Sequence, residues 1–260
     1  MCLIDFYYSY SDKGYILNLI KDRRVCNKLK YGNEINSIEF FDFTAQDFNL
    51  FFTICWHIKQ KKSKKIAISF DELKEFMPDI KNNRRFYNEI CKFARKLTKI
   101  IINIRYNNSL NTEEKMNGGL FVTKTETSLD KKEINIVIGN LTYQTLFNFN
   151  YFTKFDLNEF CSIQNKYTKT LFRLLKQYEN VNENPASGLK NIVMEKQEFL
   201  EFMNCPEKYK DKMIFTDRKI LIPAIDELNK TSQSFENVSY QKIKEGGVIK
   251  KFEISFQTIR

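Results

Sequence analysis

The feature of this chain that most limits its fold is an order of elements that occurs twice. In each half, apolar spacing predicts a helix, a short strand, a short helix, a basic helix and then strands. The first half has helices over 44–60, 71–77 and 82–99 and strands over 65–70, 100–106, 119–127 and 133–139, with a turn at 116–119. The first of these helices is expected to begin with a capping box of Thr44 and Asp47, and Pro78 is expected to end the second. The third has an apolar stripe at Phe86, Ile90, Phe93, Ala94 and Leu97. The second half has helices over 155–163, 166–180, 196–203 and 216–230 and strands over 191–194, 235–244 and 248–256.

This order is typical of a winged helix, a helix-turn-helix followed by a β-hairpin that forms the wing. The sequence therefore predicts an α+β fold of two tandem winged-helix domains related by a pseudo-repeat. We expect a poorly assigned N-terminal arm over 1–36, a first domain over 37–147 and a second over 148–260. The joining segment is rich in aromatic residues, so the two domains are expected to touch.

The helix over 216–230 has an unusual first turn. Its core-facing stripe consists of Ile220, Leu221, Ala224, Ile225 and Leu228. Thr216 is expected to be the N-cap, yet Arg218 and Lys219 follow at once, where the helix macrodipole disfavours cations. Pro223 cannot donate a hydrogen bond to the Lys219 carbonyl, so we expect either a functional kink that re-aims the first turns or a kink tolerated on an exposed side.

Charge points to a polyanionic partner. Lys and Arg total 42 against 32 Asp and Glu, which gives a formal charge of +10. The six cysteines are scattered without a Cys-x-x-Cys pair, which favours reduced core thiols over disulfides or zinc ligands. The sequence shows neither a signal peptide nor a membrane-spanning stretch, so a soluble cytoplasmic protein without a membrane partner is expected.

The residues needed for several kinds of catalysis are missing from the sequence. None of the eight glycines lies in a phosphate-binding Gly-x-x-x-x-Gly-Lys loop, and no carboxylate cluster is spaced to hold magnesium. The single histidine, His57, cannot form the metal-binding His-hydrophobic-His pair of a nicking enzyme, so a structural role is expected. We therefore expect a binding protein that is not an enzyme and that carries no cofactor and no metal.

Several motifs of the second half resemble the Rep_3 family of plasmid replication initiators. The helix before its winged-helix unit carries the family pattern at Lys166, Tyr167, Lys169, Leu171, Phe172, Arg173, Leu174, Leu175 and Lys176, with Phe172 in place of a commoner tyrosine. The later helix carries it at Pro223, Ala224, Glu227, Leu228 and Asn229, before a Lys-rich wing. The first half is also similar to the family's first winged helix, and the resemblance spans about Asn33 to Phe256.

The resemblance implies a function as well as a fold. It implies sequence-specific binding to double-stranded direct repeats, called iterons, at a plasmid origin, and opening of nearby AT-rich DNA. It also implies recruitment of host replication proteins such as a helicase, and often repression of the protein's own gene. A homodimer in equilibrium with the monomer is implied, with the first winged helix at the dimer interface.

Under this reading, the candidate DNA-contacting residues lie on the recognition helices and the wing. Arg218 is expected to bind guanine or phosphate, Lys212 and Lys219 to bind phosphate, and Thr216 to offer its hydroxyl to a base or to its own helix. The wing candidates are Lys242, Lys244, Lys250 and Lys251, and those of the first unit are Arg84, Arg85, Lys64 and Lys65. Any one of these cations, taken alone, is equally compatible with a solvated surface charge.

Three other functions are compatible with parts of this pattern. A winged-helix transcription regulator would share every DNA contact and differ only in having no role in plasmid maintenance. A DNA-nicking enzyme would leave a nicked or tyrosine-linked product on supercoiled origin DNA with magnesium. A protein-interaction scaffold would bind no duplex even at low salt.

Overall fold

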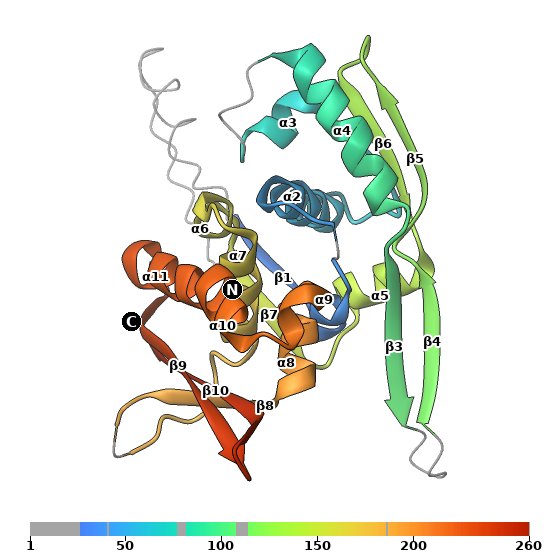
Figure 1. Ribbon diagram of the computed structural model, residues 1–260. Helices are drawn as coiled ribbons and strands as arrows, with labels where there is room; N and C mark the ends of the chain where they lie inside the picture. The colour runs from blue at the N-terminus through green and yellow to red at the C-terminus, as the bar shows by residue number, and fades with distance from the viewer. Residues whose placement is uncertain (1–26, 41, 77–81, 108–113, 186, 260) are drawn as a thin grey trace, which may run out of the picture.

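In both halves of the chain, three strands form an antiparallel sheet with the same topology. The first sheet has the order β2–β6–β5, formed by Lys65–Ser69, Glu133–Ile138 and Val122–Ser128. The second has the order β8–β10–β9, formed by Lys190–Glu195, Val248–Thr258 and Phe235–Glu245. The computed structural model describes residues 27–40, 42–76, 82–107, 114–185 and 187–259. The shared strand order confirms two winged-helix units in an α+β chain (Figure 1).

The helices of the first unit are α2 (Ala45–Lys61), α3 (Phe70–Lys74) and α4 (Asn83–Leu97). The Thr44 hydroxyl accepts from the Asp47 amide, and the Asp47 carboxylate accepts from the Thr44 amide, so the predicted capping box is present. The predicted apolar stripe of α4 is buried at all five positions, Phe86, Ile90, Phe93, Ala94 and Leu97. Both helices therefore begin and pack as their sequence patterns indicate. The Pro78 stop predicted after α3 lies outside the described residues.

The turn predicted at residues 116–119 is wrong. These residues lie within β4 (Glu114–Leu120), which pairs antiparallel with β3 (Ile101–Asn107) as a hairpin that extends beyond the first sheet (Figure 1). Side chains from neighbouring segments lie close to both of its glycines. A Cβ atom at Gly118 would lie 2.9 Å from Asn103 Oδ1, and one at Gly119 would lie 3.2 Å from Leu141 Cδ1. In this chain the glycine pair marks close packing within a strand and not a reversal of direction.

The junction of the two units includes a strand from the N-terminal segment. β1 (Lys28–Gly32) pairs antiparallel with β7 (Phe152–Asp156), with Lys28 opposite Asp156 and Gly32 opposite Phe152. A 3₁₀ helix (Asn33–Ser37) follows β1, and α5 (Asn140–Phe147) precedes β7. The described part of the predicted arm thus includes a strand, β1, that pairs with β7 beyond residue 147. The domain boundary at residue 147 remains a prediction.

Within its described residues, the second unit contains seven helical segments in addition to its sheet. They are α6 (Leu157–Ser162), α7 (Lys166–Gln177), α8 (Lys196–Phe202), α9 (Glu207–Lys210), α10 (Met213–Thr216), a π-helical turn (Asp217–Leu221) and α11 (Ile222–Thr231). The apolar stripe predicted for the helix over 216–230 is buried, and its most exposed member, Ile225, is 8% exposed. One face of this helix is therefore committed to the core of the second unit.

Aromatic packing joins the two units, as expected. Phe52 on α2 contacts Phe160 on α6 with ring centroids 4.9 Å apart, and Phe160 lies 6.0 Å from Phe172 on α7. Phe172 in turn packs edge-on against Phe235 at the start of β9, at 5.6 Å. The first and the last of these pairs are edge-to-face, a favourable arrangement of aromatic rings, so a continuous apolar core links the units.

The fully buried side chain of Arg173 lies within this shared core. Arg173 on α7 is 0% exposed, and its guanidinium carbon lies 4.9 to 5.7 Å from the ring centroids of Phe40, Phe48, Phe52 and Phe202. Its guanidinium nitrogens have no hydrogen-bond partner among the described residues. Burial lowers the pKa of Arg173 to about 10. Cation–π contacts are therefore the principal compensation for its lost hydration.

The structure also describes four of the cysteines, His57 and the length of each helix. Of the four described cysteines, Cys55 and Cys205 are buried, Cys91 and Cys161 are partly buried, and all four are free thiols. His57 is buried at 4% exposure beside Trp56. Over the described ranges, no helix is long and apolar enough to cross a membrane, and no group of three His, Cys, Asp or Glu residues is placed to hold a metal ion.

Candidate nucleic-acid interface

The helix that carries Arg218 begins three residues earlier than predicted. It begins at Met213, so Thr216 has helical backbone angles and makes no capping hydrogen bond. The Thr216 hydroxyl instead donates to the Tyr209 carbonyl at 2.9 Å, and the residue is 0% exposed. The N-cap prediction for Thr216 is therefore wrong, and its buried hydroxyl has no surface with which to contact DNA. It fastens the helix start to α9.

A π-helical turn, and not a simple kink, accommodates Pro223. The Ile222 amide donates to the Asp217 carbonyl, five residues back, instead of the carbonyl four residues back. Pro223 lies in the first turn of α11, where a missing amide hydrogen costs little. The π-helical turn thus changes the angular spacing, around the helix axis, of the residues that come before the buried part of α11.

The wing is joined to this helix by an ion pair. Lys242 on β9 pairs with the Asp217 carboxylate, and both side chains are about one-fifth exposed. Burial, together with the Asp217 carboxylate, raises the pKa of the neighbouring Tyr240. Lys242 was predicted to contact the DNA backbone, but the structure engages its ammonium group with Asp217. It therefore fixes the wing beside the helix.

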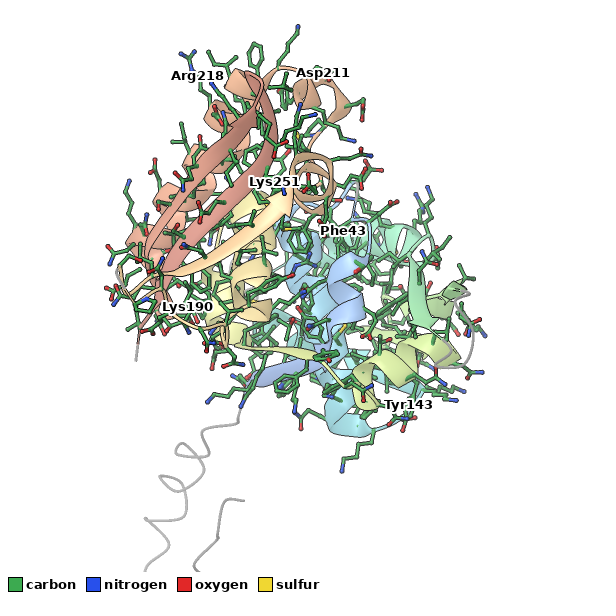
Figure 2. The ribbon with its side chains drawn as sticks, turned by 90° about the horizontal axis from the view of Figure 1, so that it is seen from below. Phe43, Tyr143, Lys190, Asp211, Arg218 and Lys251 are labelled. Carbon is green, nitrogen blue, oxygen red and sulfur yellow. The ribbon has the colours of Figure 1, made fainter. Side chains whose placement is uncertain are left out.

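Several exposed side chains on this surface are cationic. Lys212, Arg218 and Lys219 are exposed, and Arg218 lies at the outer edge of the second unit (Figure 2). On the wing, Lys244 and Lys250 are exposed and form no ion pair with any residue in the described part of the chain, whereas Lys251 pairs with Glu195 at 3.1 Å. Gly246 and Gly247 close the hairpin with positive φ angles of 58° and 83°. The start of the helix and the wing, joined through Asp217 and Lys242, thus both carry exposed cations.

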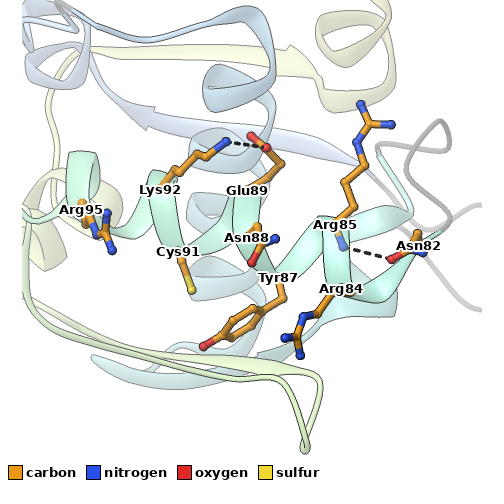
Figure 3. A pocket seen from close by; sticks show the side chains of 9 residues that line it. All are labelled: Asn82, Arg84, Arg85, Tyr87, Asn88, Glu89, Cys91, Lys92 and Arg95. Atoms are coloured by element: carbon orange, nitrogen blue, oxygen red, sulfur yellow. Dashed lines mark hydrogen bonds and ion pairs between the residues drawn. The ribbon is translucent and has the colours of Figure 1, made fainter.

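The first unit has a second basic surface along α4. A concave region is lined by Asn82, Arg84, Arg85, Tyr87, Asn88, Glu89, Cys91, Lys92 and Arg95. Asn82 caps the helix by accepting from the Arg85 amide at 3.0 Å. Arg84 and Tyr87 point to one side of α4 and Arg85 points to the other (Figure 3). Both predicted arginines therefore line this region, but their side chains leave α4 in different directions (Figure 3).

The two lysines predicted beside these arginines lie elsewhere. Lys64 donates to Asn140 Oδ1 on α5 at 2.9 Å and lies 5.3 Å from the Tyr143 ring centroid. Lys65 begins β2 and lines a separate depression on the first sheet, together with Lys124 and Lys131. Neither lysine lines the concave region on α4.

Two polar residues on α4 were absent from the predicted set. Asn88 and Arg95 follow Arg84 by four and eleven residues, and all three are exposed. Residues at this spacing share one face of an α-helix. The periodicity that indicates the buried stripe of α4 also indicates this outward face, because the polar residues recur at the same helical spacing.

Comparison with known proteins gives matches over both units. The model of the family described as "Initiator Replication protein, WH1" matches residues 28–176, and the model described as "Initiator Rep protein, WH2" matches residues 195–256. A curated relative, the probable replication protein rep of Bifidobacterium longum (strain NCC 2705), is 24% identical over 208 residues. That alignment covers 76% of this chain and 63% of the relative, so the chain spans less than two-thirds of the relative's length.

A solved structure has the same overall fold. The Pi initiator protein, crystallised in complex with iteron DNA, superposes with a TM-score of 0.68 at 16% sequence identity. The match covers 90% of this chain and 98% of that one. The arrangement of two winged-helix units is therefore shared at low sequence identity.

Proposed function

We propose that this chain, which belongs to the Rep_3 family of replication initiator proteins, binds double-stranded direct repeats at a plasmid origin and initiates replication there. The observation that carries the proposal is the joint surface of helix and wing in the second unit. The ion pair between Asp217 and Lys242 holds the wing beside Arg218, and Lys244 and Lys250 extend the cationic surface. A solved protein of the same fold was crystallised with iteron DNA, which supports this assignment.

The chemistry of the surface suits a duplex. Arg218 presents a planar fork of donors that matches guanine O6 and N7 in the major groove. Lys212, Lys219, Lys244 and Lys250 offer ammonium groups to the phosphates on either side of the groove. The face of α4 formed by Arg84, Asn88 and Arg95 offers a second set of contacts from the first unit.

A gel-shift series with direct-repeat DNA from the origin tests this proposal. We expect the logarithm of affinity to fall linearly with the logarithm of salt, by about 0.9 per phosphate contacted. Arg218→Ala should remove the preference for the repeat over a scrambled duplex, whereas Lys219→Ala should weaken both equally. Lys230→Ala, at the far end of α11, is the charge-matched control and should change neither. Equal binding of both duplexes by the wild-type chain would contradict the proposal.

Initiation requires more than binding. We propose that the same chain opens neighbouring AT-rich DNA and recruits a host helicase, and that a monomer–homodimer equilibrium and repression of its own gene accompany this role. Maintenance of a plasmid that carries the repeats and the gene, but no other initiator, separates this function from transcriptional regulation alone. Loss of the plasmid despite specific DNA binding would favour the regulator.

A further inference from the structure

Two large aliphatic side chains flank Arg218 on the outer surface of the recognition helix. Ile214 and Ile222 are 54% and 44% exposed, four residues before and four residues after Arg218. The buried stripe of Ile220, Leu221 and Ala224 occupies the opposite side of the same helix. The two isoleucines are therefore not part of the core, although each presents an apolar surface next to a charged group.

The π-helical turn brings these three side chains towards one line. In a regular α-helix, residues four apart drift by about 40° around the axis, so positions 214 and 222 would separate by about 80°. The turn over Asp217–Leu221 holds more residues than an α-helical turn, which reduces this drift. Ile214, Arg218 and Ile222 thus form a row that faces away from the core.

The neighbouring Phe215 differs from the two isoleucines. It is 42% exposed, but its ring stacks on Tyr209 with centroids 5.9 Å apart and planes inclined by 20°. Part of its apolar surface is already covered by the protein. Ile214 and Ile222 have no such partner ring among the residues that the structure describes, and they define the apolar part of the outer face.

The chemistry of the major groove supplies a matching ligand. The C5 methyl group of thymine is the apolar group on the base edges there, whereas guanine presents two acceptors to an arginine fork. We propose that Ile214 and Ile222 contact thymine methyl groups on either side of a guanine bound by Arg218. This inference rests on the proposed function and adds the bases that the helix recognises.

Helix geometry limits the spacing of those bases. Eight residues of helix rise about 12 Å, and base pairs are stacked about 3.4 Å apart. The two thymines therefore fall within roughly four base pairs of each other, with the guanine between them. A cytosine at either position would present an amino group to an aliphatic side chain that cannot accept a hydrogen bond from it.

Removal of single methyl groups from the DNA tests the inference. The full chain first selects a duplex from a random pool by gel shift, and each thymine of that duplex is then replaced, one at a time, by deoxyuridine. Wild-type affinity should fall about fourfold at two positions that flank a guanine, in line with the burial of one methyl group each. Ile214→Ala should abolish the effect at one position and Ile222→Ala at the other.

A matched variant and a defined failure complete the experiment. Val193→Ala removes an equally exposed aliphatic side chain from β8, at 52% exposure, and should keep both methyl effects. The inference is overturned if deoxyuridine has no effect on the wild-type chain, or if both isoleucine variants keep the wild-type methyl effects. If the chain shifts no duplex even at low salt, the proposed function itself fails; specific binding without methyl effects removes only the assignment of Ile214 and Ile222.

Discussion

Lys242 on β9 forms an ion pair with Asp217, the residue that directly precedes Arg218. The pair joins the wing to the recognition helix across a sequence separation of 25 residues. Each of these two charges is compensated by the other. Lys242 therefore holds the wing against the helix, and the exposed cations beside it remain available to bind a polyanion. The joint surface of the second unit thus depends on an interaction inside that unit.

This ion pair predicts different effects for two neighbouring wing lysines. Lys242→Met should destabilise the fold by about 1 kcal/mol, because Asp217 keeps a partly buried carboxylate without its cation. It should leave the salt dependence of DNA binding unchanged. Lys244→Met should leave stability unchanged and lower the slope of log affinity against log salt by about 0.9. Denaturant unfolding and a salt titration measure both quantities, and the reverse assignment would contradict this role for Lys242.

The buried Arg173 predicts an unusual effect on stability. Removing a cation from water costs several kcal/mol, and cation–π contacts in a desolvated site return about 2 kcal/mol. Arg173→Met keeps an apolar stem against the four phenylalanine rings and removes the charge. We expect the free energy of unfolding to rise by about 1 to 3 kcal/mol.

Two control variants sharpen the Arg173 experiment. Arg95→Met removes an exposed arginine from α4 and should change stability by less than about 0.5 kcal/mol. Lys169→Met removes a second fully buried cation, but one whose ammonium group donates to the Phe160 carbonyl, so this change should be destabilising. A loss of stability in Arg173→Met as large as that in Lys169→Met would show that the guanidinium group has a partner that compensates its burial.

His57 predicts a dependence of stability on pH. Burial lowers its pKa in the folded protein, and the nearby Glu72 carboxylate opposes this only in part. As the pH falls below about 6.5, the unfolded chain therefore takes up the proton first, and stability is lost until the pH reaches the pKa in the folded protein. The loss should be steeper in the wild-type chain than in His57→Phe, by less than about 1.4 kcal/mol per pH unit. Thermal unfolding between pH 7.5 and 5.5 measures the difference, and parallel curves would exclude this role.

Structural features that depend on local periodicity could be predicted from the sequence. Features that depend on residues distant in the sequence could not. The Thr44 capping box and the stripes of α4 and α11 followed from spacing alone, because burial of one helix face is encoded every three or four residues. The order of elements predicted the two winged-helix units. These features needed no knowledge of tertiary contacts.

The errors have tertiary causes. In the sequence, Thr216 resembles an N-cap. In the structure it lies within the helix, and its hydroxyl donates to the Tyr209 carbonyl. The glycines at 118 and 119 suggest a turn, but they allow Asn103 and Leu141 to approach a strand. In each case the deciding partner lies elsewhere in the sequence, beyond the range of local patterns.

The most direct test of the central claim is whether the helix and the wing touch the same DNA repeat. A photo-crosslinking amino acid at Lys219 or at Lys244, in the full chain bound to its repeat, should give crosslinks within the same helical turn of DNA. The same group at Lys154, exposed on β7, should give none. Crosslinks from only one of the two positions, or from Lys154 as strongly as from either, would contradict a shared DNA-binding surface of helix and wing.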